Sequence, residues 1–596
     1  MRNKFLIFIN LLITNFIFAQ LLELPKSILS PNAASLGKYG DISMDLNTGR
    51  ANVNIPLYSL NEGGIPLDIS LNYDTGGVRV SDVPGWVGQN WTLNAGGVIT
   101  RTVKGTTYDE QKFDAPNPYP GGGQKGYFYH TEKLNRADWN SSSYLTQLAI
   151  ESAEIGTTKF SHDLEPDIFT FNFMGYTGKF FLGEDGKWKV SSNDNIKVII
   201  DMTDNVIPMN FPSAGYNESG NPDPMKFPKS IGKITLIDGA GNKYVFGGVM
   251  NAIEFSNYDF FEQSSTGMFA TSWYLTSVYN HFNQQLYSFE YERGYYQAAF
   301  YNYNIYEDFY KSSNGAFVPN CSRSYKPNPS FAGGQLIIPS YLKKIIGLKS
   351  NVNIDFFSSE RQALSYSLND ISIVNAYNKW KLEHPENYAV PFSTWCIYGF
   401  YYLTRKQDGI TTDYPALGFD FYTADWFLSR LKWRKLDLIN ISSTNLNRNI
   451  TFNYTDNFSQ RLKLDGVIID GQQKYLFGYN NFESLPNTYL NHLIDHFGYY
   501  KGTEFNNDPI YHYSSRETNP VTLQYGSLNK LIYPTGGFTE FQYEPHTYSK
   551  SIGSDLSLLN EIGIISGLRV KKIIDFSDAI NNPTDAPANP AKLHPP

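Results

Sequence analysis

The amino-acid sequence predicts an all-β protein with very little helix, built from successive antiparallel hairpins. Three observations lead to this prediction. The 596 residues include 44 Tyr, 41 Phe, 48 Gly and 31 Pro, whereas only 18% are charged. Aromatic residues suit pleated strands, and Gly and Pro suit turns. One hairpin pattern recurs along the chain, and a lone hairpin is marginal in water. We therefore expect the hairpins to pair edge to edge into extended curved sheets or sandwiches.

The recurring pattern is an apolar strand, a polar turn and a second strand that ends in apolar-x-aromatic. Its clearest copy is WYLTSVYNHFNQQLYSFEYERG at residues 273–294, where apolar and polar positions alternate after an Asn-rich turn. Each copy has Gly or Asn in the turn, where positive φ angles cost least. Further copies lie at residues 234–247, 342–357, 436–454 and 528–543, and shorter fragments at 69–73 and 169–173. Their irregular spacing excludes a solenoid of fixed period.

The first 19 residues have the pattern of a secretory signal peptide. Arg2 and Lys4 precede an apolar run over residues 5–18, and Ala19 supplies the small residue at the cut. The run is shorter than the ~20 residues that cross a bilayer. We therefore expect a secreted or cell-surface protein, cleaved near Ala19, with no membrane span after signal removal.

Charge and cysteine content exclude several classes of function. Loss of Arg2 and Lys4 lowers the formal net charge from −8 to −10, so the mature chain has no general attraction for nucleic acid. Cys321 and Cys396 are compatible with one disulfide or with two free thiols, because sequence does not give the distance between them. Neither belongs to a Cys/His spacing typical of zinc.

Composition and pattern divide the chain into segments. The best helical stretch is residues 144–153, with Ser141–Ser143 as candidate caps and Gly156 after it. Residues 114–126 and the tail lack periodicity and are expected to be mobile. The expected divisions are a signal peptide (1–19), an N-terminal β region (20–110), a loop with a short helix (111–160), a β region with hairpins (161–300), an aromatic-rich β region (301–430), a C-terminal hairpin region (431–576) and a disordered Pro/Ala-rich tail (577–596).

Several motifs, in order, resemble the N-terminal region of RHS/YD-repeat cell-surface proteins of the Bacteroidota type. The longest is SPNAASLGKYGDISMDLNTGRANVNIPLYSL at residues 30–60, followed by a second run over 65–105. Shorter motifs are EPDIFTFNFMGYTGKFFL (165–182), ATSWYLTSV (270–278), IDHFGYYKG (494–502), YPTGGFTEFQYEPHTY (533–548) and GLRVKKI (567–573). Together they cover most of the mature chain.

The resemblance implies an exported, β-rich front part of a longer protein, in which strands wind into a large shell. Shells of this family enclose a C-terminal toxin or effector, and the family is associated with surface display, competition and adhesion. This sequence stops at Pro596, where long members continue into further repeats. Toxin activity is therefore not carried over to it.

The most tempting metal pattern is His492-Leu493-Ile494-Asp495-His496. Two histidines at i and i+4 share a helix face, but Leu493 stands where a metalloprotease has its general-base Glu. The segment continues into Phe497-Gly498, which is typical of a strand and turn. A structural interpretation is therefore favoured over a zinc site.

Other candidate sites are also interpreted structurally. The Gly183–Trp188 segment lacks phosphate-loop spacing and suits a hairpin turn. The acidic residues Asp238, Asp355, Asp420 and Glu290 are expected on strands, facing water or a neighbouring Lys. The aromatic stretches 295–310 and 398–402 are candidates for a recognition patch, although filling of inter-sheet space is favoured.

The sequence thus predicts a scaffold segment, a partial RHS-like shell with a structural or interaction role. No catalytic, cofactor-binding or metal residue is assigned, and no cofactor is expected. Expected partners are the C-terminal repeats or effector of the same system, or a surface glycan or protein. Two alternatives stay open. A carbohydrate-binding or adhesin module requires aromatic residues clustered on one solvent-facing sheet, and a glycosidase-like enzyme requires two convergent carboxylates.

Overall fold

The computed structural model describes most of the β regions of the chain. The described residues are 42–45, 47–104, 108–110, 126–129, 131, 141–146, 163–200, 230–257, 269–294, 331–366, 433–505, 514–553 and 556–576, with short strand segments at 38–39, 205–206, 297–303, 306–308, 324–326 and 592–594. The predicted signal peptide, both cysteines, Asp420, residues 398–402, most of 114–126 and most of the tail lie outside them. No helix in this part of the chain has the length and hydropathy needed to span a bilayer.

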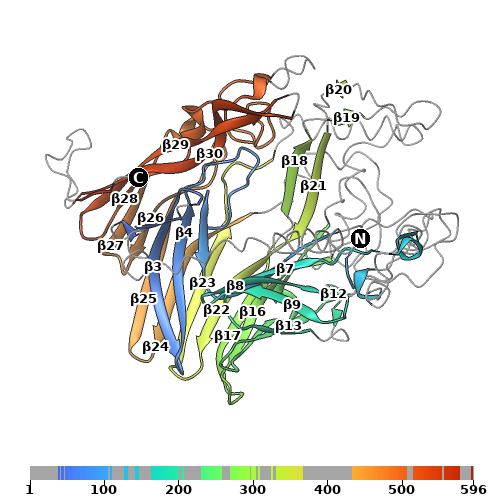
Figure 1. The fold of residues 1–596 in the computed structure, drawn as a ribbon. Coiled ribbons are helices and arrows are strands. Elements are labelled where there is room, and N and C mark those ends of the chain that lie inside the picture. The colour runs from blue at the N-terminus through green and yellow to red at the C-terminus, as the bar shows by residue number, and fades with distance from the viewer. Residues whose placement is uncertain are drawn as a thin grey trace, which may run out of the picture.

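The fold is dominated by antiparallel sheets, as predicted (Figure 1). A five-stranded sheet and a 22-stranded sheet contain nearly all the strands. The short pairs are β11 (Asn205–Val206) with β12 (Ser230–Ile231) and β19 (Tyr306–Asp308) with β20 (Ser324–Lys326). Among the described residues, helix is limited to residue 131, residues 142–146 and the 3-10 turns η1 (Tyr127–Tyr129), η2 (Met250–Ala252), η6 (Phe482–Ser484), η7 (Ser514–Arg516) and η8 (Thr522–Gln524). The Tyr144 N–H donates to Ser141 Oγ, which confirms one predicted cap.

The large sheet branches at β16 (Phe269–Tyr279). The first half of β16 pairs with β6 and β15, and its second half pairs with β14 and β17. One branch runs β9 (Trp188–Ser192), β8 (Tyr176–Leu182), β7 (Ile168–Phe173), β6 (Gly97–Thr102), β16, β15 (Ile253–Asn257), β21 (Phe331–Ile338), β18 (Gln297–Tyr303). The other begins β10 (Lys197–Ile200), β13 (Lys233–Ile237), β14 (Lys243–Gly247), β16, β17 (Gln285–Arg293).

From β17 onward the second branch grows strictly in chain order. Its strands are β22 (Ser340–Gly347), β23 (Val352–Glu360), β24 (Arg434–Ser443), β25 (Leu446–Thr455), β26 (Lys463–Ile469), β27 (Gln473–Tyr479), β28 (Leu528–Ile532), β29 (Phe538–Ile552), β30 (Leu558–Phe576) and β31 (Lys592–His594). The five long hairpins predicted from the sequence are all present, as β13–β14, β16–β17, β22–β23, β24–β25 and β28–β29. Each apolar-x-aromatic ending therefore closes the second strand of a hairpin.

The aromatic ending has a specific structural role, which we name the tyrosine clasp: the hydroxyls of Tyr291, Tyr454, Tyr479 and Tyr543. Each donates to the backbone carbonyl of a Leu in the first strand of its own hairpin, at 2.6–2.8 Å. The acceptors are Leu275, Leu436, Leu464 and Leu528, in the same order. Burial raises the pKa of all four hydroxyls, so they remain protonated donors.

Each clasp tyrosine also lies at a β-bulge in the pairing with the next strand. The register shifts between Glu290 and Tyr291, and between Asn453 and Tyr454. Equivalent shifts occur at Gly478/Tyr479 and Gln542/Tyr543. A bulge bends its strand and increases the local twist. The repeated F-x-Y ending therefore sets a regular series of bends along the sheet.

The five-stranded sheet covers one face of the bent sheet, and the two enclose the core (Figure 1). It consists of β1 (Lys38–Tyr39), β2 (Ile42–Asp45), β3 (Arg50–Glu62), β4 (Ile65–Asp74) and β5 (Trp91–Asn94). Buried and exposed residues alternate along β3, as expected when one face meets a core. Its buried Val53 and Ile55 belong to the same core cluster as Ile439 and Ile450 of the large sheet.

Buried polar contacts hold the two sheets in one relative position. The Tyr287 hydroxyl accepts from the Glu62 N–H at 3.0 Å and donates to the Ile65 carbonyl at 2.7 Å. The Glu62 carboxylate accepts the N–H groups of Lys349 and Ser350 in the β22–β23 turn. Two further contacts involve the tyrosine clasp: Trp91 Nε1 donates to Tyr479 Oη at 2.8 Å, and the Leu528 N–H donates to Tyr73 Oη at 3.0 Å.

The tyrosine clasp is tested by Tyr543→Phe. This change removes only the hydroxyl and leaves the buried Leu528 carbonyl without its donor, so we expect a loss of about 1–3 kcal/mol in the free energy of unfolding. Urea unfolding followed by fluorescence measures it. Tyr475→Phe is the matched control, because the Tyr475 hydroxyl makes no hydrogen bond within the described residues. Equal stability of Y543F and the wild type would contradict the role of the clasp.

Candidate functional site

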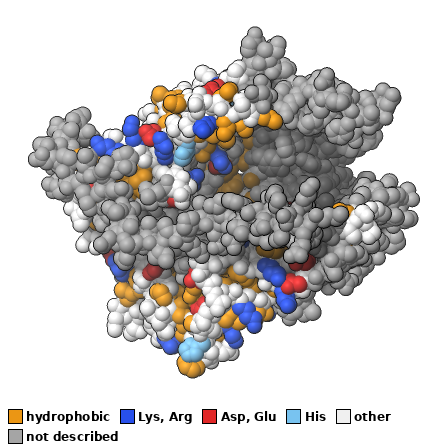
Figure 2. Space-filling view, viewed as in Figure 1, with side chains coloured by type: hydrophobic (Ala, Val, Ile, Leu, Met, Phe, Trp, Pro, Cys, Tyr) orange, Lys and Arg blue, Asp and Glu red, His pale blue; other side chains and the backbone are white. Residues whose placement is uncertain are grey.

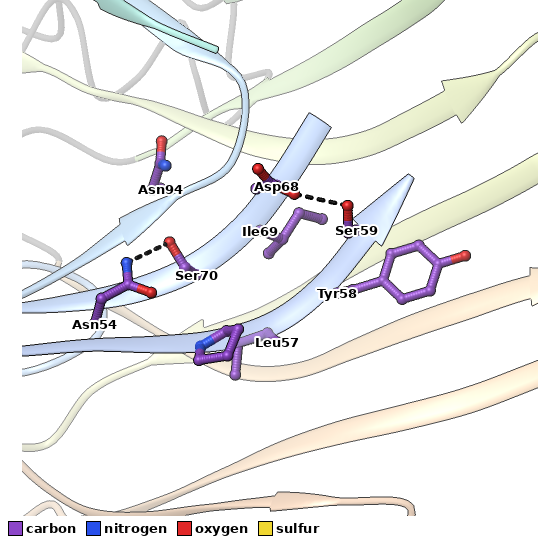
Figure 3. Close-up of a pocket in the computed structure, with 9 residues that line it drawn as sticks. Asn54, Leu57, Tyr58, Ser59, Asp68, Ile69, Ser70 and Asn94 are labelled. Carbon is purple, nitrogen blue, oxygen red and sulfur yellow. Dashed lines mark hydrogen bonds between the residues drawn. The ribbon is translucent and has the colours of Figure 1, made fainter. Parts of the chain in front are cut away.

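A hollow of about 450 Å³ lies on the hairpin formed by β3 and β4 (Figure 3). The pairing of these strands shifts register between Pro56 and Tyr58, so that Leu57 is an extra residue in β3. A bulge bends its strand and re-aims the side chains beside it. The lining residues are Asn54, Pro56, Leu57, Tyr58, Ser59, Asp68, Ile69, Ser70 and Asn94.

The polar groups of the hollow come from three adjacent strands. Asn54 Nδ2 donates to Ser70 Oγ at 3.1 Å, and Ser59 Oγ donates to Asp68 Oδ1 at 2.6 Å. Figure 3 shows Asn94 on the side of Ser70 and Asp68, whereas the Tyr58 ring extends away from it. Amide, hydroxyl and carboxylate groups on one surface are suited to hydrogen bonding with a polar ligand. With one carboxylate in the hollow, two-carboxylate glycoside hydrolysis has no basis there.

A second cluster of functional groups is buried around Arg101 of β6. Its guanidinium donates to Glu110 Oε1 at 2.8 Å and lies 3.8 Å from Asp167 Oδ2. It also lies over the Trp273 ring, 5.1 Å from the centroid. Asp109 and Asp167 are joined reciprocally, because each accepts the backbone N–H of the other. The cluster thus fastens the loop after β6 to the segment before β7.

Three carboxylates share this buried site with one guanidinium, so the guanidinium balances only one of the three negative charges. Burial raises the pKa of Asp109, and the nearby Asp167 raises it further, while Arg101 opposes both effects. Burial also raises the pKa of Asp167, again against Arg101. Within the described residues, no group of three or more His, Cys, Asp and Glu is arranged to hold a metal ion. The raised pKa values of Asp109 and Asp167 favour a protonated carboxyl in the cluster, whose contacts join two segments of the chain.

The two histidines of the candidate zinc pattern lie on a turn, where they do not share a helix face. The Asp495 N–H donates to the Tyr499 carbonyl, and Asp495 Oδ1 accepts the N–H groups of Phe497 and Tyr499. The His492 ring packs 4.6 Å from the Phe505 ring, and burial lowers its pKa. The segment therefore serves as a tightly hydrogen-bonded turn.

This turn packs against the connection between β4 and β5. The Val80 N–H donates to the Gly498 carbonyl at 2.9 Å, and the buried Arg461 donates to the Val80 carbonyl at 2.6 Å. Arg461 also lies over the Tyr489 ring, 4.5 Å from its centroid. Two long connections from distant parts of the sequence are thus fastened together by backbone contacts and one arginine.

The remaining candidates from the sequence are dispersed. Residues 183–188 form the β8–β9 turn, where the Gly183 N–H donates to the Lys187 carbonyl. Asp238 follows β13 in a turn, a correction to its expected place on a strand, and accepts from Tyr244 and Asn242. Asp355 lies 3.4 Å from Lys344, and Glu290 is exposed on β17.

The aromatic stretch 295–310 runs through β18 and β19, but its aromatic side chains lie outside the described residues. Among described aromatic residues, the most exposed are Phe458, Phe282, Phe357 and Phe497; Phe357 lies on β23, and the other three lie in different turns or connections. They do not form a shared aromatic platform.

Sequence reasoning missed the hollow and the Arg101 cluster for different reasons. The hollow depends on a register shift, which alternation alone does not reveal. The cluster unites Arg101, Asp109 and Asp167, and no short motif marks such separated residues. A weak signal was present, because Arg101 occupies an otherwise buried position of an alternating strand, and a buried Arg requires partners.

Comparisons with known proteins add little to this geometry. No family model matches the sequence, and no curated protein matches it. Among solved structures, the chain is similar to the crystal structure of TcdB2-TccC3, with a TM-score of 0.29 and 9% identity. That match covers 88% of this chain and 20% of the other chain, so this chain spans about a fifth of its length.

The Arg101 cluster predicts an unusual pH dependence of stability. The folded-state pKa of Asp109 is raised above the unfolded value of about 3.9, so the folded protein binds more protons than the unfolded one. The contribution of Asp109 to the free energy of unfolding is full below a pH of about 3.9 and is lost as the pH rises through the folded-state pKa. We expect Asp109→Asn, which mimics the protonated form, to flatten the decline in the free energy of unfolding between neutral and mildly alkaline pH, by up to about 1.4 kcal/mol per pH unit.

Urea unfolding at a series of pH values measures this slope. The D109N/D167N double variant is the companion measurement, and it should flatten the slope by less than the sum of the single variants, because the two groups are in contact. A D109N slope identical to that of the wild type would disprove the assignment.

Proposed function

We propose that this chain is an exported β scaffold, a segment of an RHS/YD-repeat surface protein, with a structural or interaction role and no catalysis of its own. The observation that carries the proposal is the construction of the large sheet. From β17 to β31 its strands follow chain order, and the clasp and bulge recur along it. This arrangement suits a wall that is extended by adding hairpins.

The charged groups support a structural role. Arg101, Arg461 and Asp495 are buried and bonded to neighbouring backbone or side chains. On the strands, charged residues lie beside one another as pairs such as Lys344–Asp355 and Lys530–Glu540. Such pairs contribute little to stability and suit a solvated wall. Proposed partners are further repeats or an effector of the same system, or a surface glycan or protein.

The proposal is tested by expressing the full sequence in a Gram-negative host. We expect mass spectrometry of the mature protein to place its N-terminus at Gln20 and the protein to reach the cell exterior. Tyr543→Phe is expected to reduce the displayed amount in step with its loss of stability, whereas Tyr475→Phe is not. Cytoplasmic retention with Met1 intact would refute export, and a hydrolytic activity abolished by Asp355→Asn or Glu290→Gln would refute a non-catalytic role.

The hollow on β3 and β4 favours carbohydrate binding as a second candidate function. Its amide, hydroxyl and carboxylate groups are the kind that recognise sugar hydroxyls. In affinity electrophoresis against a panel of soluble polysaccharides, we expect retardation of the wild type by one of them and its loss in Asp68→Asn and Asn94→Ala. Asn52→Ala is the matched control, on an exposed position of β3 outside the hollow. Equal mobility of all variants would exclude this site.

A further inference from the structure

The guanidinium of Arg361 is held in one orientation at the end of the β23–β24 hairpin. Arg361 directly follows β23, and its backbone N–H donates to the carbonyl of Trp433, just before β24, at 3.0 Å. Its Nη1 donates to the Pro84 carbonyl, in the connection between β4 and β5, at 2.8 Å. The guanidinium also lies over the Trp433 ring, 4.8 Å from its centroid. These contacts fix the side chain but use only one of its three nitrogen atoms.

The other two nitrogen atoms of Arg361 have no acceptor. Its Nε and Nη2 are buried and make no hydrogen bond to any residue that the structure describes. These two atoms donate parallel N–H bonds from one side of the guanidinium, and we name the pair the Arg361 fork. Such a fork matches the two oxygens of a carboxylate. A buried donor without an acceptor costs free energy, so the fork has an unmet requirement for a ligand atom.

The positive charge of Arg361 also lacks a bonded counter-charge. Asp456 interacts with it electrostatically, but Asp456 Oδ1 accepts the N–H groups of Gln362 and Ala363 at 2.8 and 2.6 Å. Asp456 Oδ2 lies 4.0 Å from Lys435 Nζ. Burial lowers the pKa of Arg361, and the charge of Asp456 opposes this only in part. An anionic acceptor therefore suits the fork better than a neutral one.

A further donor and aromatic rings lie around the fork. The Tyr341 and Tyr489 side chains interact electrostatically with Arg361. Tyr341 Oη accepts from Gln297 Nε2 at 2.5 Å, and its own O–H donates to no group in the described part of the chain. The Trp86 ring lies 5.4 Å from the Tyr341 ring. The surroundings of Arg361 thus combine flat apolar surface with one hydroxyl that can donate.

This set of donors favours a carboxylate over a phosphate. The Arg361 fork and the Tyr341 hydroxyl supply three donors, which a carboxylate accepts with its two oxygens. A phosphate would bring further oxygens that need donors when they are buried. Figure 2 shows Lys and Arg side chains interspersed with Asp and Glu on the coloured part of the face that it presents, without a broad basic surface. Binding of an anion therefore depends on the fork rather than on a general attraction.

We propose that the Arg361 fork is a binding site for a small molecule that carries a carboxylate. Nε and Nη2 hold the two carboxylate oxygens, the Tyr341 hydroxyl is the third donor, and the aromatic rings contact the body of the ligand. A small ligand is required because the fork atoms are buried, so that entry depends on movement of the side chains that cover them. The site goes beyond the proposed export and scaffold role and does not depend on it.

Saturation-transfer difference NMR of the full chain tests the proposal, with sodium benzoate as the probe in a Tris-chloride buffer. We expect saturation transfer to the benzoate protons, and acetate should abolish it by competing for the fork. Benzyl alcohol has the same ring without a carboxylate, so it is the matched control and should show no transfer. Absence of transfer to benzoate, or transfer that acetate does not reduce, would overturn the site. Competition by inorganic phosphate as strong as that by acetate would overturn the preference for a carboxylate.

Arg361→Lys tests the fork itself. Lysine keeps the charge but lacks the planar pair of donors, so we expect the Kd for benzoate to rise by at least about tenfold. Arg50→Lys is the matched control, because Arg50 is an exposed arginine that already lies 3.0 Å from Asp74, and its Kd should equal that of the wild type. Saturating benzoate should raise the melting temperature of the wild type and of R50K, but not of R361K. Equal Kd values for R361K and the wild type would exclude the fork as the site.

Tyr341→Phe is a second variant, which leaves Arg361 in place. Loss of one donor is expected to raise the Kd for benzoate by about 2–10-fold, less than the loss of the fork. The melting temperature measured without benzoate shows that each variant is folded at the temperature of the titration. Benzoate binding by Y341F as tight as that of the wild type would contradict the role of the hydroxyl.

Discussion

The structure depends on one hydrogen bond that is repeated in four hairpins. In each, a buried tyrosine hydroxyl reaches back to a leucine carbonyl just beyond the point where the ladder of the hairpin ends. A buried carbonyl without a donor is costly, so the clasp keeps the two strands together where the backbone pairing stops. The bulge at the same tyrosine then bends the sheet toward the next strand. The same tyrosine thus bends the sheet and holds the two strands of its hairpin together.

The bent sheet requires a cover, and the five-stranded sheet provides it. Its buried face shares the core with the large sheet, and its polar contacts reach the clasp itself through Trp91 and Tyr73. Tyr287 and Glu62 link the two sheets, because their buried polar groups bond from one sheet to the other. Apolar contact supplies the stability, whereas these hydrogen bonds select one position among many similar ones.

Buried charged groups perform a related task in the connections. Arg101 joins Asp167 and Glu110, and Arg461 holds the carbonyl of Val80. Both arginines also lie over aromatic rings, which a planar guanidinium favours. A pairing of titratable groups therefore does not indicate catalysis here. The hollow on β3 and β4 and the exposed apolar side chains at the distal end of the β29–β30 hairpin lie elsewhere.

Sequence by itself determined the all-β class and the five long hairpins, because alternation and turn chemistry are local properties that neighbouring residues settle. It also favoured a structural interpretation over a helical zinc pair at His492 and His496, since Phe497-Gly498 is typical of a strand and turn. Only the tertiary structure decided that Tyr543 bonds to Leu528, that Leu57 forms a bulge beside a hollow, and that Arg101 meets Asp109 and Asp167. These features depend on register and on contacts between distant segments, which local patterns do not encode.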